Sequence, residues 1–546
     1  MTTPSASELL ATGNHFLNQN NLPEAKRHYQ QALEQNPDES KAHFLLGWIA
    51  HQEQQPELAL NHLQSACAQA PSNKEYVSAL AQVLEQLQRT NDIPPLYQRY
   101  ITHDATHPDI WLAWAISLAK AGQAQQAAQV LQDAIKKFPD VLALHMNFGE
   151  LLYHHQHYNE ALQVYQNALD SGLKSEGLYQ NIAKLHTHMG QVEAARKVLE
   201  QGMQAYPGKL VFAYRLATIN PDYLSLSMLR DLAEAPAPQD PENSFYYHWL
   251  MASLARQQDQ AFKEMEHLVE AHSLYAQSSR FQLDTAFYLD TLPQLATSLA
   301  QTHGFEANAE LAALAPVFVV GTPRCGSTLI ENVICAGQDA LKKGEETGVA
   351  LQALVAAMGQ NNGAFWPAFQ SYLKQGYQQH QLLSTEKGFT DKSLENIFLV
   401  PLLQRVFPKA KFILVQRQPL ASTVSILQNN MAVLPWAHAI NDILRYVDNC
   451  EKTAAALQQT MQNKLLTVHY EDFVAQPAAA SQTVKAFCAL TWDESCLSSH
   501  ADASLFSKTA SHVQVREAIH QKARDRQQPY TEFFAPYRDA YPWVAA

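Results

Sequence analysis

The chain has 546 residues and a mass of 61.1 kDa, which is too long for a single hydrophobic core, and its 47% apolar and 17% charged residues exclude a disordered protein. The net charge of −13 is concentrated in residues 1–300, which carry −12, whereas residues 301–546 carry −1. An acidic first half beside a nearly neutral second half argues against nucleic-acid binding, which needs a basic surface.

The cysteines and the first residues bear on location. Six cysteines are scattered without a CxxC pair, and the opening MTTPSASELL lacks a basic segment followed by an apolar one. These features predict reduced thiols, no secretory signal and a cytoplasmic protein. The apolar run 311–320 is too short to span a bilayer and contains Pro316, so no membrane span is expected.

Small residues recur every 34 positions through the first 217 residues. A small residue within a helix lets a second helix approach closely, and a proline after the second helix ends it. Units of this length stack into a solenoid, and chance does not keep six units in phase. The recurring residues are Gly13, Gly47, Ala81, Ala115, Gly149, Ala183 and Ala217, and twelve positions after the first six lie Ala25, Ala59, Ile93, Ala127, Ala161 and Ala195.

This pattern resembles the tetratricopeptide repeat, with regular repeats over residues 6–209 and degenerate or bridging helices over 210–300. The third unit departs from it at Ile93 and Tyr100, and its Pro94-Pro95 predicts the start of a helix. The resemblance implies an α-solenoid domain over residues 1–300 with a groove for a peptide or protein partner. Whether the acidic repeats recruit a substrate or a scaffold partner, and whether the chain forms a homo-oligomer, stays open.

Three histidines, His154, His155 and His157, fall at a turn between two repeat helices. No cysteine or carboxylate completes a recognisable ligand spacing around them. Solvated turn residues are the simpler interpretation, and no metal site is predicted.

The stretch 317–331, VFVVGTPRCGSTLIE, predicts a buried strand, a glycine turn and a helix. Such a turn places backbone N–H groups and a helix N-terminus around an anion. The NTPase loop GxxxxGK[ST] has a lysine where this chain has Ser327, so a nucleoside triphosphate is a poor fit. The cation lies within the loop instead, at Arg324, where a guanidinium forks onto a terminal phosphate.

At these residues the chain resembles the sulfotransferases, whose G-x-P-R-x-G-[ST]-T loop holds the 5′-phosphosulfate of the donor 3′-phosphoadenosine-5′-phosphosulfate (PAPS). The resemblance implies a P-loop-like α/β domain over residues 310–546 with a central parallel sheet, and PAPS as donor without a metal. Cys325 stands where the family usually has serine, and its backbone N–H is expected to serve in place of its thiol. The loop residues implied to bind the donor are Gly321, Pro323, Arg324, Cys325, Gly326, Ser327 and Thr328.

A second predicted strand, Lys411–Gln416, ends at Arg417, and Ser425 follows eight residues later on the next helix. A strand end and a helix start converge on one ligand face in an open α/β sheet. This spacing is similar to the family's 3′-phosphate signature, which implies that both residues bind the donor. The chain departs from the family at Gln418, where members often have aspartate, and at Asn429, where the tyrosylprotein branch has arginine.

Four shorter stretches extend the resemblance to the tyrosylprotein sulfotransferases: GEET at 344–347, FTDK at 389–392, VHYE at 468–471 and TASHVQV at 509–515. In that branch the second glutamate of GEET is the catalytic base, which implies Glu346. The motif lies one residue further from the loop than in the family, so Glu345 also stays open as the base. Taken alone, either carboxylate also fits a first-turn residue that favours the helix dipole.

The remaining roles follow from the same resemblance. Lys392 and Ser511 are implied to stabilise the leaving phosphate oxygen, and Tyr470 and Arg526 to contact the donor. His469 and His512 rank below the glutamates as bases because the family motif gives them no role. For Lys392 a surface position is the plain alternative, and for Tyr470 an ordinary packing role is.

Together these motifs imply a PAPS-dependent sulfotransferase that moves a sulfuryl group to a hydroxyl acceptor, with a tyrosine of a peptide or protein recruited by the repeats as the favoured acceptor. A lipid, a polysaccharide and a small alcohol stay open as acceptors. The alternative is a catalytically silent repeat scaffold that binds nucleotide and partner proteins, motivated by Gln418, Asn429 and an altered tail after Arg526. A P-loop kinase or NTPase would need the phosphate lysine that the loop lacks.

Overall fold

The computed structural model describes residues 4–278, 281, 283–337, 339–359, 365–383, 388–461, 463–501 and 527–545. Contacts within the chain divide it into two compact units, Met1–Leu185 and His186–Ala546, and each is considered separately. No described helix combines the length and the apolar character that a bilayer crossing requires.

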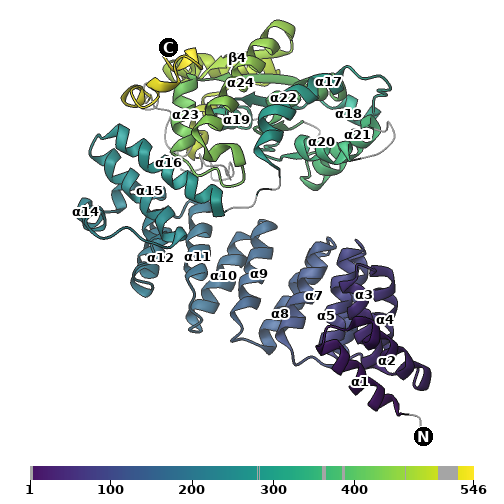
Figure 1. The fold of residues 1–546 in the computed structure, drawn as a ribbon. Coiled ribbons are helices and arrows are strands. Elements are labelled where there is room, and N and C mark those ends of the chain that lie inside the picture. The colour runs from purple at the N-terminus through teal and green to yellow at the C-terminus, as the bar shows by residue number, and fades with distance from the viewer. Residues whose placement is uncertain are drawn as a thin grey trace. The chain divides into compact units, whose positions relative to one another are not determined.

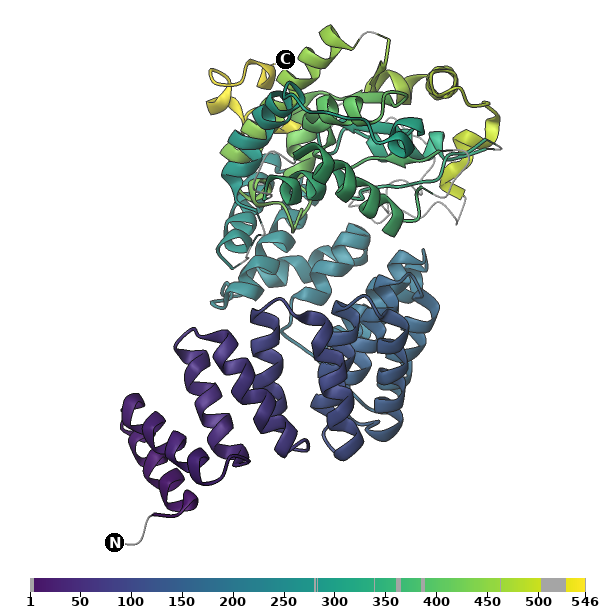
Figure 2. The same cartoon turned by 90° about the vertical axis from the view of Figure 1, so that its right-hand side faces the viewer.

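The first unit consists of helix hairpins that follow one another along the chain (Figures 1 and 2). Each hairpin packs its two helices together and then contacts the next hairpin, as the predicted solenoid requires. The helices are α1 (Ala6–Asn18), α2 (Leu22–Gln35), α3 (Ser40–Gln52), α4 (Pro56–Gln69), α5 (Lys74–Gln86), η1 (Thr90–Asp92), α6 (Ile93–His103), α7 (Pro108–Lys120), α8 (Ala124–Lys137), α9 (Leu142–His154), α10 (Tyr158–Asp170) and α11 (Glu176–His188), the last of which crosses the division.

The periodic small residues lie where two helices of one hairpin meet. A Cβ added to Gly13 would lie 2.4 Å from Cε1 of Tyr29, and one added to Gly149 would lie 2.3 Å from Cε1 of Tyr165. No side chain fits at these distances, so the recurring glycines are the space into which the partner helix places a large residue. The close helix approach predicted from the period is confirmed.

The third unit keeps the hairpin despite its larger residues. Helix α6 begins at Ile93 with prolines in its first turn, as predicted from Pro94-Pro95. Tyr100 is fully buried and takes the position that alanine has in most other units. Its hydroxyl donates to Oδ2 of Asp104 at 3.3 Å, which satisfies the polar end of the ring.

The second unit continues with helices and contains every strand that the structure describes. Before the sheet come α12 (Val192–Ala205), α13 (Val211–Ile219), η2 (Pro221–Tyr223), α14 (Leu226–Glu234), α15 (Pro241–Gln257), α16 (Ala261–Ser278), η3 (Phe287–Thr291), α17 (Leu292–Ala300) and α18 (Ala309–Ala313). The α/β part contains β1 (Val317–Gly321), α19 (Ser327–Ile334), α20 (Val349–Met358), α21 (Phe365–Gln379), β2 (Thr390–Asp391), α22 (Asn396–Val406), β3 (Lys411–Gln416), α23 (Pro419–Leu427), η4 (Pro435–His438), α24 (Ile440–Thr460), β4 (Leu465–His469), α25 (Tyr470–Ala475), α26 (Pro477–Cys488), η5 (Glu494–Ala501), η7 (Gln528–Tyr530), η8 (Ala535–Tyr537) and η9 (Pro542–Val544).

The described strands form a four-stranded, all-parallel sheet in the order β2-β1-β3-β4. Phe318 of β1 is in register with Asp391 on one side and with Phe412 on the other. Both predicted strands are present: β3 has its predicted bounds, and β1 begins the predicted strand–turn–helix stretch at Val317. The predicted α-solenoid followed by an α/β domain with a central parallel sheet is therefore confirmed.

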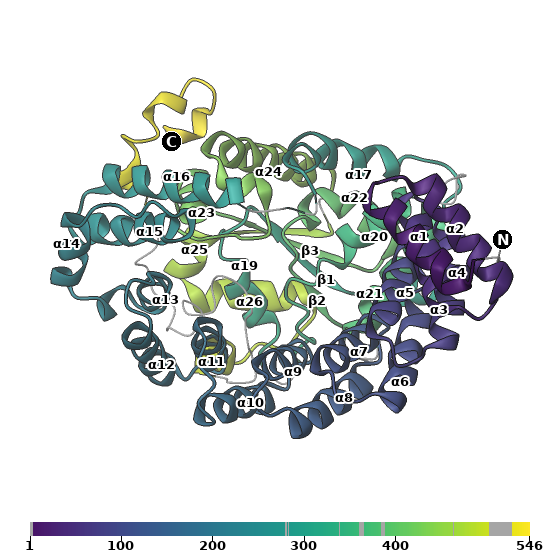
Figure 3. The same cartoon turned by 60° about the horizontal axis from the view of Figure 1, so that its bottom comes forward.

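Both faces of the sheet are buried, as a parallel sheet requires. Phe318 and Phe412 point into the larger core, which helices α20, α21, α22 and α24 complete. Val319 and Ile413 point into a second core beneath α19 and α26. Figure 3 shows the strands between α24 on one side and α26 on the other.

The helices before the sheet share the core of the α/β part. Met265 and Leu268 of α16 and Leu292 of α17 belong to the same apolar cluster as Phe318. The sequence motifs divide the chain near residues 300–310, whereas the contacts divide it at 185/186. The contacts place the division earlier because apolar faces of these bridging helices are buried against the α/β part. The motif-based domain boundary stays a prediction.

Candidate active site

The carboxyl ends of the parallel strands meet at one edge of the sheet. The loop 322–326 follows β1, Lys392 follows β2, Arg417 follows β3 and Tyr470 follows β4. In an open α/β sheet this edge is where ligands bind. The fold therefore brings four separate motifs of the sequence to one place.

The loop after β1 has the conformation of an anion-binding turn. Gly326 has φ = +96°, and a Cβ there would lie 2.4 Å from Cδ2 of Tyr470, so only glycine fits. Arg324 also has a left-handed backbone, at φ = +69°. Helix α19 begins directly afterwards, at Ser327 and Thr328, and no side chain of the described residues caps its N-terminus.

Arg324 of this loop and Arg417 at the end of β3 lie close together. Nε of Arg324 donates to Oγ of Ser425 at 3.1 Å, and Nη1 of Arg417 donates to the Arg324 carbonyl at 3.0 Å. The Arg417 guanidinium also lies over the Tyr470 ring, 4.9 Å from its centroid. Burial lowers the pKa of Arg417, and Tyr470 and Glu471 act in the opposite direction. A buried cation cluster of this kind favours an anionic ligand.

The structure thus joins two motifs that the sequence assigns to opposite ends of the donor. Arg324 belongs to the predicted 5′-phosphosulfate loop, and Ser425 belongs to the predicted 3′-phosphate signature, yet their side chains are hydrogen-bonded. The two departures from the family lie beside them. Asn429 donates to the Ser425 carbonyl at 2.7 Å, and the Gln418 backbone N–H donates to Oε1 of Glu471 at 3.1 Å.

Cys325 is buried beneath the loop. Burial raises the pKa of its thiol to about 11, so the thiolate that nucleophilic chemistry requires does not form at neutral pH. Its backbone N–H donates to the Thr322 carbonyl at 3.1 Å and so closes the turn. The neighbouring Pro323 is buried as well.

An ion pair lies at the end of β2. Nζ of Lys392 donates to Oε1 of Glu346 at 2.9 Å. The lysine side chain is 1% exposed and the glutamate side chain 38% exposed, so the carboxylate faces solvent while the ammonium is enclosed. Burial lowers the pKa of Lys392, but Glu346 and Glu331 outweigh it, and the net direction is upward. Lys392 is not a surface lysine.

Glu345, the other candidate base, makes different contacts from Glu346. Its backbone is left-handed at φ = +57°, its carbonyl accepts from the Lys392 N–H at 2.8 Å, and its carboxylate lies 3.9 Å from Lys343. Its side chain is only 12% exposed. Of the two candidate bases, Glu346 is therefore the more exposed one, and its assignment as the base stays a prediction.

Comparison with known proteins matches two families to different parts of the chain. The sulfotransferase family matches residues 316–494, and the tetratricopeptide repeat matches residues 10–102, 112–174 and 177–209. The chain joins tetratricopeptide repeats to a sulfotransferase-family domain. The repeat family thus ends at 209, and the sulfotransferase family covers β1 to β4 together with the Lys392–Glu346 pair.

The relatives are distant. An uncharacterized protein of Aquifex aeolicus (strain VF5) is 23% identical over 412 residues, which are 69% of this chain and 52% of that protein. Protein-tyrosine sulfotransferase 1 of Danio rerio is 27% identical over 206 residues, 33% of this chain and 55% of that enzyme. The chain thus spans about half the length of these relatives. PilF of Pseudomonas aeruginosa resembles the repeats at 19% identity, covering 39% of this chain and 96% of PilF with a TM-score of 0.28.

The sulfotransferase domain also contains polar residues that sequence reasoning missed. Asp391, buried beside Lys392, accepts hydrogen bonds from Thr347, Tyr377, Ser393 and Asn396. Glu331 and Thr390 are fully buried and hydrogen-bonded to each other at 2.8 Å. A carboxylate inside the stretch LIENVI, which is apolar except for Glu331 and Asn332, was a signal for Glu331, because such a residue is buried only with partners.

Three residues named from the sequence lie outside the described residues: Ser511, His512 and Arg526. Their assignments stay predictions. His469 is exposed at the end of β4. Trp436, buried, stacks on Tyr446 with ring centroids 3.7 Å apart, which is a packing role.

Two of the three histidines of the repeat turn have a carboxylate close by. Nε2 of His154 lies 3.7 Å from Glu150, and Nδ1 of His157 lies 3.5 Å from Glu160. Within the described part of the chain, no three side chains that bind metals gather at one point.

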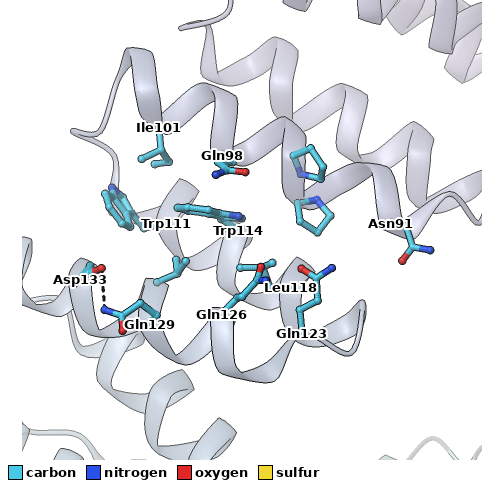
Figure 4. A pocket seen from close by; sticks show the side chains of 13 residues that line it. Asn91, Gln98, Ile101, Trp111, Trp114, Leu118, Gln123, Gln126, Gln129 and Asp133 are labelled. Atoms are coloured by element: carbon cyan, nitrogen blue, oxygen red, sulfur yellow. Dashed lines mark hydrogen bonds between the residues drawn. The ribbon is translucent and has the colours of Figure 1, made fainter.

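The repeat unit has a groove of about 450 Å³ between α6, α7 and α8 (Figure 4). Trp111 and Trp114 of α7 lie in it, with ring centroids 6.0 Å apart at 51°. Nε1 of Trp111 donates to the Ala105 carbonyl at 3.2 Å. Amide side chains surround the tryptophans, namely Asn91, Gln98, Gln123, Gln126 and Gln129, and Asp133 is the charged residue of this described lining.

Proposed function

We propose that the chain is a PAPS-dependent sulfotransferase whose acceptor is a hydroxyl group, with a protein or peptide tyrosine as the favoured acceptor. One observation carries the proposal. The Lys392–Glu346 pair lies at the same sheet edge as an arginine-bearing anion turn, 2.9 Å separating its two charged atoms. Sulfuryl transfer asks a protein for such an arrangement, because it needs in-line positioning and stabilisation of negative charge.

The donor end of the site fits a nucleotide with two anionic groups. The loop 322–326 and the N-terminus of α19 receive the 5′-phosphosulfate, and Arg417 with Ser425 receives the 3′-phosphate. The Tyr470 ring closes over Gly326 and Arg417. When bound, PAPS supplies the activated sulfuryl group. The missing phosphate lysine argues against a nucleoside triphosphate here.

At the acceptor end, Glu346 takes the proton from the incoming hydroxyl onto its carboxylate. Lys392 keeps its own proton and donates a hydrogen bond to the leaving phosphate oxygen. Both roles require the pair to separate during the reaction, since Lys392 donates to Glu346 in the structure. A carboxylate near a phenolic hydroxyl supplies the general base that a tyrosine acceptor needs at neutral pH.

Transfer of labelled sulfate from PAPS to a panel of acceptors tests this directly. The panel contains tyrosine peptides, glycans, a lipid headgroup and small alcohols. Wild type should label one class, and Glu346→Gln should reduce kcat by about 100-fold to 10,000-fold while Glu345→Gln retains most of it. Equal turnover in wild type and Glu346→Gln would remove this carboxylate from the mechanism.

The silent scaffold is the second candidate, favoured by the position of Asn429. Its side-chain amide donates to the Ser425 carbonyl at 2.7 Å. An arginine at this position would instead add a charge to the 3′-phosphate site. The two candidates differ in one measurement. Binding of desulfated donor (PAP) without transfer to any acceptor of the panel supports the scaffold and contradicts the enzyme.

The repeats are proposed to bind a peptide segment of the acceptor or of a partner protein. The groove around Trp111 and Trp114 suits an extended, uncharged segment, because the aromatic rings take a proline or aliphatic side chain and the amides satisfy its backbone. Its single acid, Asp133, already accepts from Gln129 at 3.1 Å. Proline-containing peptides should bind wild type and lose affinity in Trp114→Ala, whereas Trp48→Ala, at an exposed tryptophan of α3 outside the groove, should not change it.

A cytoplasmic location is part of the proposal. All six cysteines are buried and unpaired, which suits a reducing compartment. Fractionation of the native cell, followed by detection of the chain in the cytoplasmic fraction, tests it. Recovery with extracellular or envelope material would contradict it.

A further inference from the structure

Glu331 is the buried charge of the site that the proposed mechanism does not use. It lies on α19, one helical turn after the anion loop, and is 0% exposed. A fully buried carboxylate is costly unless it is held by hydrogen bonds and balanced by a cation. Its contacts therefore show what it does.

One oxygen of Glu331 ties together two segments of the site. Oε1 accepts from the Glu345 backbone N–H at 3.0 Å and from Oγ1 of Thr390 at 2.8 Å. Thr390 Oγ1 also lies 3.2 Å from the N–H of Gly344. The 344–346 turn and the end of β2 are thus both attached to the helix that follows the anion loop.

This attachment sets the position of the ion pair. Glu345 is held in a left-handed backbone conformation, which a non-glycine residue adopts only when its surroundings require it. Its carbonyl then accepts from the Lys392 backbone N–H at 2.8 Å. Glu346 follows Glu345 directly and meets Nζ of Lys392. The clamp at Glu331 therefore positions both members of the pair.

The other oxygen of Glu331, Oε2, is buried and makes no hydrogen bond to the described residues. Burial raises the pKa of Glu331, and the nearby charges of Lys392 and Lys343 oppose this. Other carboxylates also lie around Lys392. Glu346 and Glu345 raise its pKa. Asp391 is held by its own hydrogen bonds, and Glu395 is the residue directly before α22.

We propose that Glu331 is the positioning residue and resident counter-ion of Lys392, which stays an ammonium when Glu346 leaves it to accept the proton of the acceptor. The proposal rests on the proposed function for its catalytic consequence. Without Glu331, the enclosed ammonium would lose a second carboxylate when Glu346 turns to the acceptor, and of the three glutamates that raise its pKa only Glu345 would stay. It would then release its proton at lower pH and no longer donate to the leaving oxygen.

Direct titration of Lys392 tests the proposal without any turnover. In wild type with ¹³Cε-labelled lysine, the NMR signal that disappears in Lys392→Met should titrate above the ordinary lysine value of about 10.4. In Glu331→Gln, which retains the side-chain shape, it should titrate at least about one pH unit lower. A Lys392 signal that titrates at the same pH in both proteins overturns the proposal, and so does a wild-type value well below 10.

Kinetics supply the second readout once an acceptor is found. Glu331→Gln should lower kcat, should bind PAP within about threefold of wild type, and should move the alkaline limb of the pH profile of kcat to lower pH. Thr390→Val keeps the charge of Glu331 and removes one of its hydrogen bonds, so the alkaline limb of the pH profile of kcat should stay in place in this variant. A purely structural role would lower kcat equally at every pH, and that result overturns the counter-ion.

Glu395→Gln is the matched control. Glu395 is another buried carboxylate of the sulfotransferase domain, and burial raises its pKa to about 7. Because it is not part of the clamp, its replacement should leave the Lys392 titration unchanged. If Glu331→Gln fails to fold, Glu331→Leu takes its place with the same expected decrease in the Lys392 titration, and a wild-type value well below 10 overturns the proposal in either case. Absence of sulfate transfer combined with the expected titration would contradict the proposed function and leave the counter-ion intact.

Discussion

The two units of the chain bury very different side chains. Among the described residues up to 185, the buried polar side chains are Ser117 and His145. The second unit buries two lysines, several acids and an arginine, and most of these lie at the carboxyl edge of its sheet. Buried charge costs free energy unless it is paired, so a fold retains it where chemistry needs it. The repeats therefore depend on apolar packing, and the buried charges support the proposal that the sheet edge is the reactive site.

The largest effect expected from this contrast is on catalysis at Lys392. Lys392→Met should lower kcat by about 100-fold to 1,000-fold, because the hydrogen bond to the leaving oxygen is lost, with little change in PAP affinity. Steady-state kinetics and calorimetry measure both quantities.

Lys485 provides the matched control, because it is also fully buried in the second unit but donates to the backbone carbonyls of Ile334 and Ala336. Lys485→Met should lower the unfolding midpoint and leave kcat per folded molecule unchanged. Loss of catalysis in both variants would mean that buried lysines here only hold the fold.

The next effect is on stability at Asp391. Asp391→Asn places an amide where four residues donate to a carboxylate, and should cost about 2–4 kcal/mol of the free energy of unfolding. Ser117→Ala in the repeats removes one hydrogen bond to the Trp114 carbonyl and should cost about 1 kcal/mol or less. Urea unfolding compares the two, and equal costs would remove the contrast between the units.

Within the repeats, packing at the periodic glycines should dominate. Gly149→Ala forces a Cβ to 2.3 Å from Tyr165 and should cost about 1–3 kcal/mol. Gly177→Ala is the control, since its Cβ would meet only the end of Met146, at 3.4 Å, and alanine favours a helix. Hydrogen exchange of α9 and α10 should rise in the first variant alone. Unchanged exchange in Gly149→Ala would contradict the predicted close packing.

The smallest expected effect concerns how the stability of the second unit changes at acidic pH. In the second unit, Nδ1 of His272 lies 2.9 Å from Nδ1 of His438. Burial lowers the pKa of His272 to about 4 and of His438 to about 3. Between about pH 6.5 and pH 4 the unfolded chain binds more protons than the folded chain, so the stability of this unit falls as the pH falls. His272→Gln should flatten this dependence in urea titrations, and an unchanged slope would contradict it.

The sequence predicts the repeats and the strand ends because both depend on local patterns. Stacked helix hairpins of equal length leave a 34-residue period in the sequence. The strands β1 and β3 are predicted by apolar runs that end at a glycine turn or at an arginine. Lys392 and Glu346 were named from their motifs, and the structure brings them to 2.9 Å.

Other parts of the site could not be predicted, because they pair residues far apart in the chain. Glu331 meets Thr390 across 59 residues, and Arg324 meets Ser425 across 101. No short motif records such a pairing. The packing of α16 and α17 against the α/β core was missed for the same reason, since their apolar faces resemble those of repeat helices.

The central claim is that the carboxyl edge of the sheet binds the phosphorylated adenosine of a sulfate donor. Calorimetric titration of PAP into the full chain tests it, with Arg417→Met and Trp48→Ala as variant and control. The account predicts one site per chain, binding weakened at least about 100-fold in Arg417→Met and unchanged in Trp48→Ala. No binding of PAP to the wild type, or equal affinity in Arg417→Met, would contradict it.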